Sequence, residues 1–201
     1  MKTTQLALLA AAAATASAAE VKQTGPFALQ IVDSGNSSLN GQFLSSCHAG
    51  AAIEALCYST ASPEKPLTAK NAAQYYLNTT EGSSNGGLLW WNLPVGNGNV
   101  PSAMQLEART YSDLSPAMFW PGADKYTPVY FDDAGKLHLK APFDETKFAV
   151  FDRPTPSEVS LYQWEACWNN AGGYYYPTIN WAVGTGHPRN PTCTAVNITK
   201  V

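Results

Sequence analysis

The sequence has few charged residues and no cluster of basic ones. Only 13% of its 201 residues are Asp, Glu, Lys or Arg, whereas about 25% is usual for a globular protein. Proteins that bind the phosphate backbone of nucleic acids group Lys and Arg on one surface. This chain has 12 basic and 15 acidic residues, a net charge of −3 and no such group. Nucleic acid is therefore not an expected partner.

The sequence also lacks an apolar run long enough to span a bilayer, which needs about 20 residues. Its longest run, Leu6–Ala14, follows Lys2 and precedes a small-residue motif at residues 16–18. This order is typical of a secretory signal peptide and its cleavage site. The C-terminus shows neither a lipid-anchor tail nor a retention tetrapeptide. We expect a signal peptide at residues 1–18, a single secreted domain at residues 19–201 and no membrane partner.

No long helical periodicity follows the signal peptide, and strands do not alternate with helices, which excludes a parallel α/β sheet. Short alternating runs, separated by Gly, Pro, Asn and Asp, indicate about ten to twelve strands. The clearest lie at residues 27–32, 73–78, 104–109, 129–131, 136–140, 162–168 and 175–183. Asp132–Gly135 is a predicted hairpin loop, and residues 49–56 are expected to include one short helical turn. The chain is predicted to be an all-β, single antiparallel domain.

Two antiparallel architectures fit this pattern, a trefoil-like barrel and a β-sandwich. The chain divides into three stretches of about four strands each, at residues 27–93, 103–140 and 148–198. This weak threefold organisation slightly favours the trefoil. The proline-rich segments at residues 62–66 and 153–156 are expected to be surface loops.

The four cysteines are Cys47, Cys57, Cys167 and Cys193. An even number in an oxidising compartment predicts two disulfides, with three possible pairings. Pairing Cys47 with Cys57 and Cys167 with Cys193 is simplest, because both loops are local. Such closures contribute about 3 and 3.5 kcal/mol in the chain-entropy model. A zinc site is the alternative, but no C-x2-C pair is present.

Three tripeptides match the acceptor sequence for N-glycosylation, at Asn36, Asn78 and Asn197. Side chains of a strand alternate between its two faces. Asn78 and Asn197 lie opposite their apolar neighbours, and Asn36 lies in a turn-like segment. All three are expected to point to solvent.

The sequence contains only three histidines and none of the common catalytic motifs. His138 lies between Leu137 and Leu139, so we expect it to face solvent. His48 follows Cys47, whose predicted disulfide removes the free thiolate that a Cys–His nucleophile requires. His187 lies in a loop rich in Gly and Pro. A copper-dependent oxygenase would need His as its first mature residue, where this chain has Ala or Glu. No catalytic, metal-binding or cofactor-binding residue is therefore predicted.

Glycoside hydrolysis requires two facing carboxylates. The candidates are Glu107, Asp132, Asp133, Asp144, Glu145 and Glu165. No sequence feature pairs any two of them. A hydrolase with an unrecognised site stays a third hypothesis.

The chain is rich in large aromatic residues, with 6 Trp and 10 Tyr. Most alternate onto predicted inward faces, among them Trp168 and Tyr175. Trp90, Tyr174 and Tyr176 alternate to the polar face. Amphipathic rings on a polar face stack on sugars or form protein contacts, although neighbouring loops also cover such rings. These three residues are the candidate ligand surface.

Both cysteine-centred ends of the chain carry distinctive short motifs. These are Leu39–Leu44 followed by Cys47–Ala52 and Leu56-Cys57, then Trp164-x-x-Cys167, Tyr174–Tyr176, Asn180-Trp181 and Asn190-Pro191-x-Cys193. With them, the chain resembles a family of small secreted ascomycete fungal proteins of uncharacterised function. The resemblance implies a fungal extracellular or wall-associated protein and supplies no catalytic residues. The Gln-x-Trp repeats of ricin-type lectins and the inhibitory loop of Kunitz-type inhibitors are not found.

The leading hypothesis is a non-catalytic secreted protein that binds carbohydrate or lies in the cell wall. The signal peptide, the sequons and the outward aromatic residues motivate it. The alternative is an interaction protein, such as a protease inhibitor or an effector, whose partner is extracellular.

Overall fold

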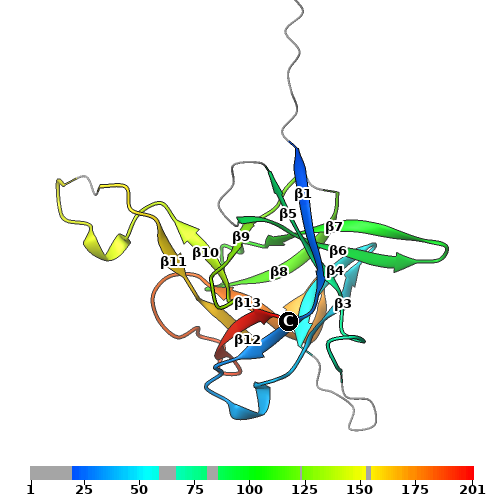
Figure 1. Ribbon diagram of the computed structural model, residues 1–201. Helices are drawn as coiled ribbons and strands as arrows, with labels where there is room; N and C mark the ends of the chain where they lie inside the picture. The colour runs from blue at the N-terminus through cyan, green and yellow to red at the C-terminus, as the bar shows by residue number, and fades with distance from the viewer. Residues whose placement is uncertain (1–19, 59–66, 81–85, 123, 153–154) are drawn as a thin grey trace, which may run out of the picture.

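The computed structural model describes residues 20–58, 67–80, 86–122, 124–152 and 155–201. Within these ranges the chain is almost entirely β-structure, with 14 strands in one antiparallel sheet and two short 3-10 helices (Figure 1). The all-β, antiparallel prediction is confirmed. The predicted signal peptide, the proline-rich segment 62–66 and residues 153–154 lie outside the described ranges.

The 14 strands are numbered in chain order. They are β1 (Val21–Phe27), β2 (Leu29–Val32), β3 (Leu44–Gly50), β4 (Ile53–Tyr58), β5 (Tyr75–Thr80), β6 (Gly86–Val95), β7 (Gly98–Leu106), β8 (Leu114–Pro121), β9 (Pro128–Phe131), β10 (Leu137–Ala141), β11 (Val159–Leu161), β12 (Trp164–Ala171), β13 (Tyr174–Ala182) and β14 (Thr194–Lys200). The 3-10 helices are η1 (Ser37–Leu39) and η2 (Glu145–Lys147).

The sheet is not closed into a barrel. Its main path runs β11-β10-β9-β6-β7-β8-β4-β13-β12-β14-β2. Off this path, β5 pairs with β1 and β6, β3 pairs with β4, and β8 also pairs with β13. The remaining contacts are isolated bridges, such as the one between Gln30 and Phe43. The slight preference for a trefoil-like barrel was therefore wrong, and a sandwich-like single domain fits. The three sequence stretches interleave in the sheet instead of forming three equivalent units, since β4 lies between β8 and β13.

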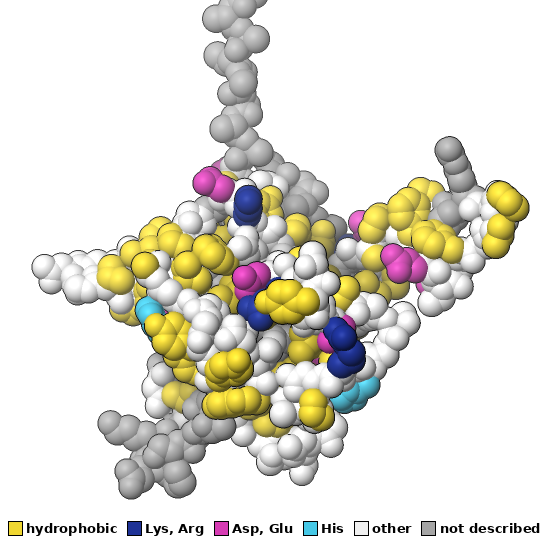
Figure 2. Space-filling model, turned by 180° about the vertical axis from the view of Figure 1, so that it is seen from behind, with side chains coloured by type: hydrophobic (Ala, Val, Ile, Leu, Met, Phe, Trp, Pro, Cys, Tyr) yellow, Lys and Arg dark blue, Asp and Glu magenta, His cyan; other side chains and the backbone are white. Residues whose placement is uncertain are grey.

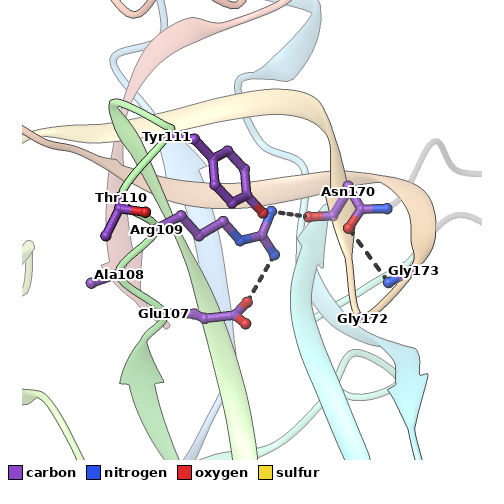
Figure 3. A pocket seen from close by; sticks show the side chains of 8 residues that line it. All are labelled: Glu107, Ala108, Arg109, Thr110, Tyr111, Asn170, Gly172 and Gly173. Carbon is purple, nitrogen blue, oxygen red and sulfur yellow. Dashed lines mark hydrogen bonds and ion pairs between the residues drawn. The ribbon is translucent and has the colours of Figure 1, made fainter.

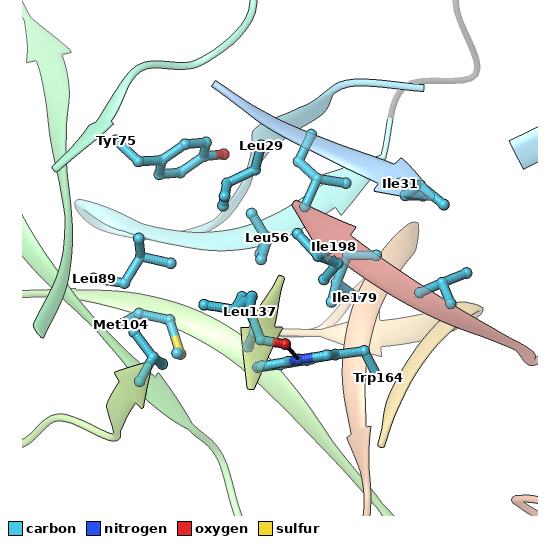
Figure 4. Close-up of a cluster of buried hydrophobic side chains, with 14 of the residues drawn as sticks. Leu29, Ile31, Leu56, Tyr75, Leu89, Met104, Leu137, Trp164, Ile179 and Ile198 are labelled. Carbon is cyan, nitrogen blue, oxygen red and sulfur yellow. Dashed lines mark hydrogen bonds between the residues drawn. The ribbon is translucent and has the colours of Figure 1, made fainter. Parts of the chain in front are cut away.

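One face of the sheet packs on the main core (Figure 4). Its fully buried side chains come from most of the strands and include Leu29, Leu56, Tyr75, Leu89, Met104, Leu137, Trp164, Ile179 and Ile198. The period-two alternation of a strand places such residues on the same side. The indole nitrogen of Trp164 donates a hydrogen bond of 2.9 Å to the carbonyl of Leu137, so the one polar group of this ring is paired in the core.

The opposite face of the sheet is covered in part, and both disulfides lie there. Cys47 pairs with Cys57, and Cys167 pairs with Cys193, which are the two local pairings expected. Around the first bond lies a small buried cluster with Ala49, Ala55, Cys57, Met118 and Ala171. A tight turn at Ala51-Ala52 joins β3 to β4, so the helical turn predicted within residues 49–56 is absent.

The predicted hairpin at Asp132–Gly135 joins β9 to β10. Gly135 has φ +77° and donates its N–H to the carbonyl of Asp132 at 2.9 Å, a conformation that Gly adopts at little cost. His138, the second residue of β10, was predicted to face solvent but is buried, with 4% exposure. The rings of Tyr130 and Tyr162 lie 5.7 and 5.1 Å from its ring and cover it.

An arm projects from the body between β10 and β11, and we define it by its described residues 142–152 and 155–158 (Figures 1 and 2). Lys140 and Glu158 form an ion pair of 2.9 Å at its base. Phe148, Val150 and Phe151 are 54%, 84% and 106% exposed. Phe148 packs on Phe143 within the arm, with ring centroids 6.3 Å apart. The arm thus exposes Val150 and Phe151 almost fully to solvent. None of the described helices is long and apolar enough to cross a membrane.

Candidate functional site

Two of the three predicted ligand residues pack with a histidine in a row of three rings. Tyr174 and Tyr176, on β13, stack with their ring centroids 6.1 Å apart. The ring of His48, from β3, packs edge-on to Tyr174 at 5.5 Å. Tyr174 is 46% exposed, whereas Tyr176 is half-buried against the cluster around Met118. Tyr174 therefore presents a ring to solvent, and Tyr176 mainly supports it.

The third predicted residue, Trp90, lies elsewhere. On β6 it is paired with Tyr76 of β5 and with Ala103 of β7, while β7 and β8 separate β6 from β13 in the sheet. Its indole nitrogen donates to Oδ1 of Asn92 at 3.1 Å. The structure therefore brings Tyr174 and Tyr176 together but does not bring Trp90 to them.

The most exposed rings of the β12–β13 hairpin are two that the sequence analysis placed inside. Trp168 and Tyr175 are 53% and 63% exposed. The register pairs Trp168 with Pro177 and Asn170 with Tyr175, so both rings continue the face that carries the core residues Trp164 and Ile179. The alternation is right, but the hairpin extends beyond the core, and its last rings face solvent. No signal in the sequence marks where the core ends.

A pocket of about 430 Å³ opens beside this hairpin tip (Figure 3). The loop between β7 and β8 forms one wall, and the tip of the hairpin forms the other. Its lining consists of Glu107, Ala108, Arg109, Thr110, Tyr111, Asn170, Gly172 and Gly173. Figure 3 shows Arg109 and Tyr111 reaching across from the loop towards Asn170. Tyr111 is 77% exposed, so its ring stands at the mouth of the pocket.

The guanidinium of Arg109 is the fixed polar group of the pocket. Its Nη2 lies 2.8 Å from Oε2 of Glu107, and its Nη1 donates to the carbonyl of Asn170 at 3.1 Å. The Arg109 side chain is only 10% exposed, and that of Glu107 is 37% exposed. Because a guanidinium is planar and carries five N–H donors, these two contacts set its orientation and leave further donors for a ligand.

Two glycines shape the other wall. Gly172 has φ +60°, and a Cβ atom there would lie 1.8 Å from the carbonyl oxygen of Ala49. Gly173 has φ +92°, and a Cβ atom there would meet no described atom within 4 Å. The first glycine therefore lets the hairpin pack closely on β3. The second leaves backbone open to the pocket, where a ligand can approach it.

Arg189 holds the loop that carries Tyr111 in place at the C-terminal end of the loop. Nε of Arg189 lies 3.3 Å from Oδ2 of Asp113, and the Arg189 backbone N–H donates to the same oxygen at 2.9 Å. Nη2 of Arg189 donates to the carbonyl of Tyr111 at 3.2 Å. The hydrogen bond from the Arg189 backbone is the main cause that lowers the pKa of Asp113. The pocket wall is therefore anchored at both Arg109 and Asp113.

Two buried carboxyl groups lie outside the pocket. Burial raises the pKa of Glu54, while a hydrogen bond from Ser46 and the nearby His48 oppose the shift. The Nδ1 atom of His48 is 3.7 Å from Oε1 of Glu54. Burial also raises the pKa of Glu165, against a smaller opposing effect of His187. No group of three or more His, Cys, Asp or Glu residues in the described ranges is placed to hold a metal ion.

The three sequons occupy different environments. Asn36 is exposed and caps η1, its Oδ1 accepting from the backbone N–H of Ser38 at 3.1 Å. Asn78 and Asn197 are half-buried on strands β5 and β14. Nδ2 of Asn197 donates to Oδ2 of Asp33 at 3.4 Å. Oδ1 of Asn78 accepts from Nε2 of Gln23 at 2.9 Å.

Comparison with known proteins places the chain in a family. No curated protein and no solved structure matches it. A family model described as a domain of unknown function (DUF7907) matches residues 24–201. This range includes every strand from β2 to β14, the pocket and both disulfides. The chain therefore belongs to the DUF7907 family of domains of unknown function.

Proposed function

We propose that this is a secreted, non-catalytic fungal glycoprotein of the extracellular space or cell wall, and that it binds carbohydrate at the tip of the β12–β13 hairpin. The observation that carries the binding proposal is the exposure of Trp168 and Tyr175 on the hairpin whose tip lines the pocket of Arg109. Two disulfides, the signal-like N-terminus and three sequons support the secretory route.

The site combines the two kinds of group that sugar recognition uses. Flat aromatic rings pack on the apolar C–H face of a pyranose, as they do on other amphipathic surfaces. Planar polar groups such as guanidinium, carboxylate and amide then bond the equatorial hydroxyls. Arg109, Glu107 and Asn170 supply these groups in one pocket, and Tyr111 supplies a ring at its mouth. Tyr175 is the cross-strand partner of Asn170 and supplies a second ring on the same hairpin.

The test is retention on polysaccharides. The disulfide-bonded chain of residues 19–201 is applied to chitin, β-1,3-glucan and mannan, and then to a glycan array. We expect retention on at least one of them. Trp168→Ala and Tyr175→Ala should each weaken it about tenfold, since removing a stacking ring at a binding hot spot costs more than 1 kcal/mol.

The matched control is Phe148→Ala. This ring is 54% exposed, like that of Trp168, but lies on the arm. Retention should be unchanged in the control. Absence of retention on every glycan would contradict the proposal, and so would equal weakening by all three substitutions, because the binding would then be a general hydrophobic effect.

The arm favours a second candidate function, an interaction protein that inserts a loop into a partner. Its exposed Phe148, Val150 and Phe151 form the kind of apolar surface that marks protein contacts. A panel of secreted proteases tests this alternative. Inhibition that is lost in Phe151→Ser but kept in Tyr175→Ala would support it, and no inhibition of any protease would contradict the inhibitor version.

A further inference from the structure

The Asn78 sequon lies in a row of side chains on one face of the sheet. Asn78 is opposite Gln23 of β1 and Leu88 of β6. Tyr76 precedes it by two residues, so it shares the same face, and Trp90 lies directly opposite Tyr76. Directly opposite residues such as Tyr76 and Trp90 have Cβ atoms about 5 Å apart. Trp90 is the diagonal neighbour of Asn78, at about 7–8 Å, which is within reach of an aromatic side chain. A group attached to Asn78 therefore meets two aromatic rings.

The amide nitrogen of Asn78, the atom to which a glycan attaches, is oriented away from β1. The Oδ1 atom of Asn78 accepts the hydrogen bond from Gln23 on β1. Because an amide is planar, this turns Nδ2 away from β1. The indole of Trp90 is fixed as well, by its bond to Asn92 two residues further along β6. Tyr76 and Trp90 are both only half-buried, so part of each ring is available for contact.

We propose that Asn78 carries an N-linked glycan whose first sugar packs on Tyr76 and Trp90 and stabilises the fold. The proposal rests on the secretion proposed above but not on carbohydrate binding at the hairpin. The donor is a lipid pyrophosphate-linked oligosaccharide of the secretory compartment. A bond forms between Nδ2 and C1 of the first sugar, the C1–O bond to the pyrophosphate breaks, the amide loses one proton, and the lipid pyrophosphate leaves.

The other two sequons lack this environment. Asn197 is opposite Val32 on β2, and its neighbours on the same face of β14 are Ala195 and Thr199. Asn36 lies in the capping turn of η1. A glycan at either site meets no aromatic ring of its own or the neighbouring described strand. The packing also explains the position of Trp90 away from the hairpin, since its ring serves the glycan of its own chain.

The experiment uses the protein secreted from a eukaryotic host, with the Asn78 glycopeptide measured by mass spectrometry. The glycan is trimmed to one sugar with an endoglycosidase or removed with an amidase, which leaves Asp at position 78. We expect occupancy at Asn78, an unchanged Tm after trimming, and a loss of about 2–4 °C after complete removal. The same treatments are repeated on Tyr76→Ala, in which only the cost of the new charge at position 78 should remain.

Two controls separate packing from other effects. Asn78→Asp and Asn78→Gln both lack the glycan at this site, so the difference between their Tm values gives the cost of the new charge. Asn197→Gln should change Tm by less than Asn78→Gln. An unoccupied Asn78, or a glycan effect of the same size in Tyr76→Ala, overturns the proposal. Neither result depends on polysaccharide retention, so failure here and failure of glycan binding at the hairpin are distinguishable.

Discussion

Trp164 and Trp181 face each other across the β12–β13 ladder, with their ring centroids 5.0 Å apart and their planes at 80°. This edge-to-face arrangement is one that aromatic pairs prefer. Trp164 has no exposed surface, and Trp181 is 8% exposed. Four residues along the same face of β12, Trp168 is more than half exposed. One strand therefore carries a core tryptophan and a surface tryptophan in the same orientation.

Replacing Trp164 by Phe should destabilise the fold. The change removes the N–H that bonds the Leu137 carbonyl and leaves a void, because the smaller ring does not fill the site. Leaving a buried carbonyl unpaired costs about 1–3 kcal/mol, and the void adds to this. We expect a loss of about 3 kcal/mol, measured as the free energy of unfolding in urea.

The matched change Trp168→Phe lies on the same strand and face but outside the core. Its effect on the free energy of unfolding should stay within about 0.5 kcal/mol, as for ordinary surface substitutions. Equal losses in the two variants would mean that the hairpin tip is packed as tightly as the core, contrary to the structure.

Gly172 and Gly173 allow a second paired comparison. Both have positive φ, a conformation that costs a residue with a side chain about 1–2 kcal/mol. Only at Gly172 would a Cβ atom also collide with backbone, the carbonyl oxygen of Ala49. We expect Gly172→Ala to lose about 3 kcal/mol in urea unfolding and Gly173→Ala about 1 kcal/mol. Similar losses would show that the close approach to β3 is not required.

The pocket depends on the shape of the Arg109 head group as well as its charge. Lysine has the same charge but a single ammonium, which cannot contact both Glu107 and the carbonyl of Asn170 as the guanidinium does. Arg109→Lys should therefore weaken polysaccharide retention about tenfold. Glu107→Gln keeps an oxygen to accept from Arg109 and should weaken retention less. If Arg109→Lys binds as well as the wild type, the guanidinium does not orient the ligand.

The sequence was sufficient for the local features of the fold. Alternation, turn residues and loop length predicted the Asp132–Gly135 hairpin and the antiparallel strands, because these depend on neighbours in the chain. The pairing of Cys47 with Cys57 follows the same local logic. Whether the sheet closes depends on which strands distant in sequence pair, as β4 does with β13. Short-range sequence patterns do not predict such pairing. The trefoil preference failed for this reason.

The alternation of residues predicted on which face of a strand each side chain lies, but not whether other parts of the chain bury it. Thr178 and Asn180 alternate to the predicted polar face, yet both are completely buried. His138 is likewise on the expected face but under two tyrosine rings. Tyr175 shows the opposite case, an inward-facing ring beyond the end of the core. Exposure is set by tertiary neighbours, so the aromatic residues most available to a ligand could not be chosen from alternation alone.

The last prediction concerns Glu165, whose carboxyl is buried on β12 with 6% exposure. Its Oε2 has no hydrogen-bond partner among the described residues. Burial raises its pKa above the ordinary value of 4.5. The folded state therefore keeps this proton at a pH where the unfolded chain has already lost it. The resulting stabilisation is fully present below pH 4.5 and is lost as the pH rises towards the folded pKa.

Glu165→Gln removes this dependence, because the amide is neutral at every pH. The variant should match the wild type in Tm below pH 4.5 and exceed it at neutral pH, where the wild type must bury a charge. The carboxylates that stabilise the fold at higher pH, such as Asp113, are common to both proteins and cancel in the difference. Glu158→Gln, on the exposed base of the arm, is the control for removing a surface carboxylate. A Tm difference that does not grow between acid and neutral pH would show that Glu165 is solvated, and that the face of the sheet around Cys167 is more open than the structure has it.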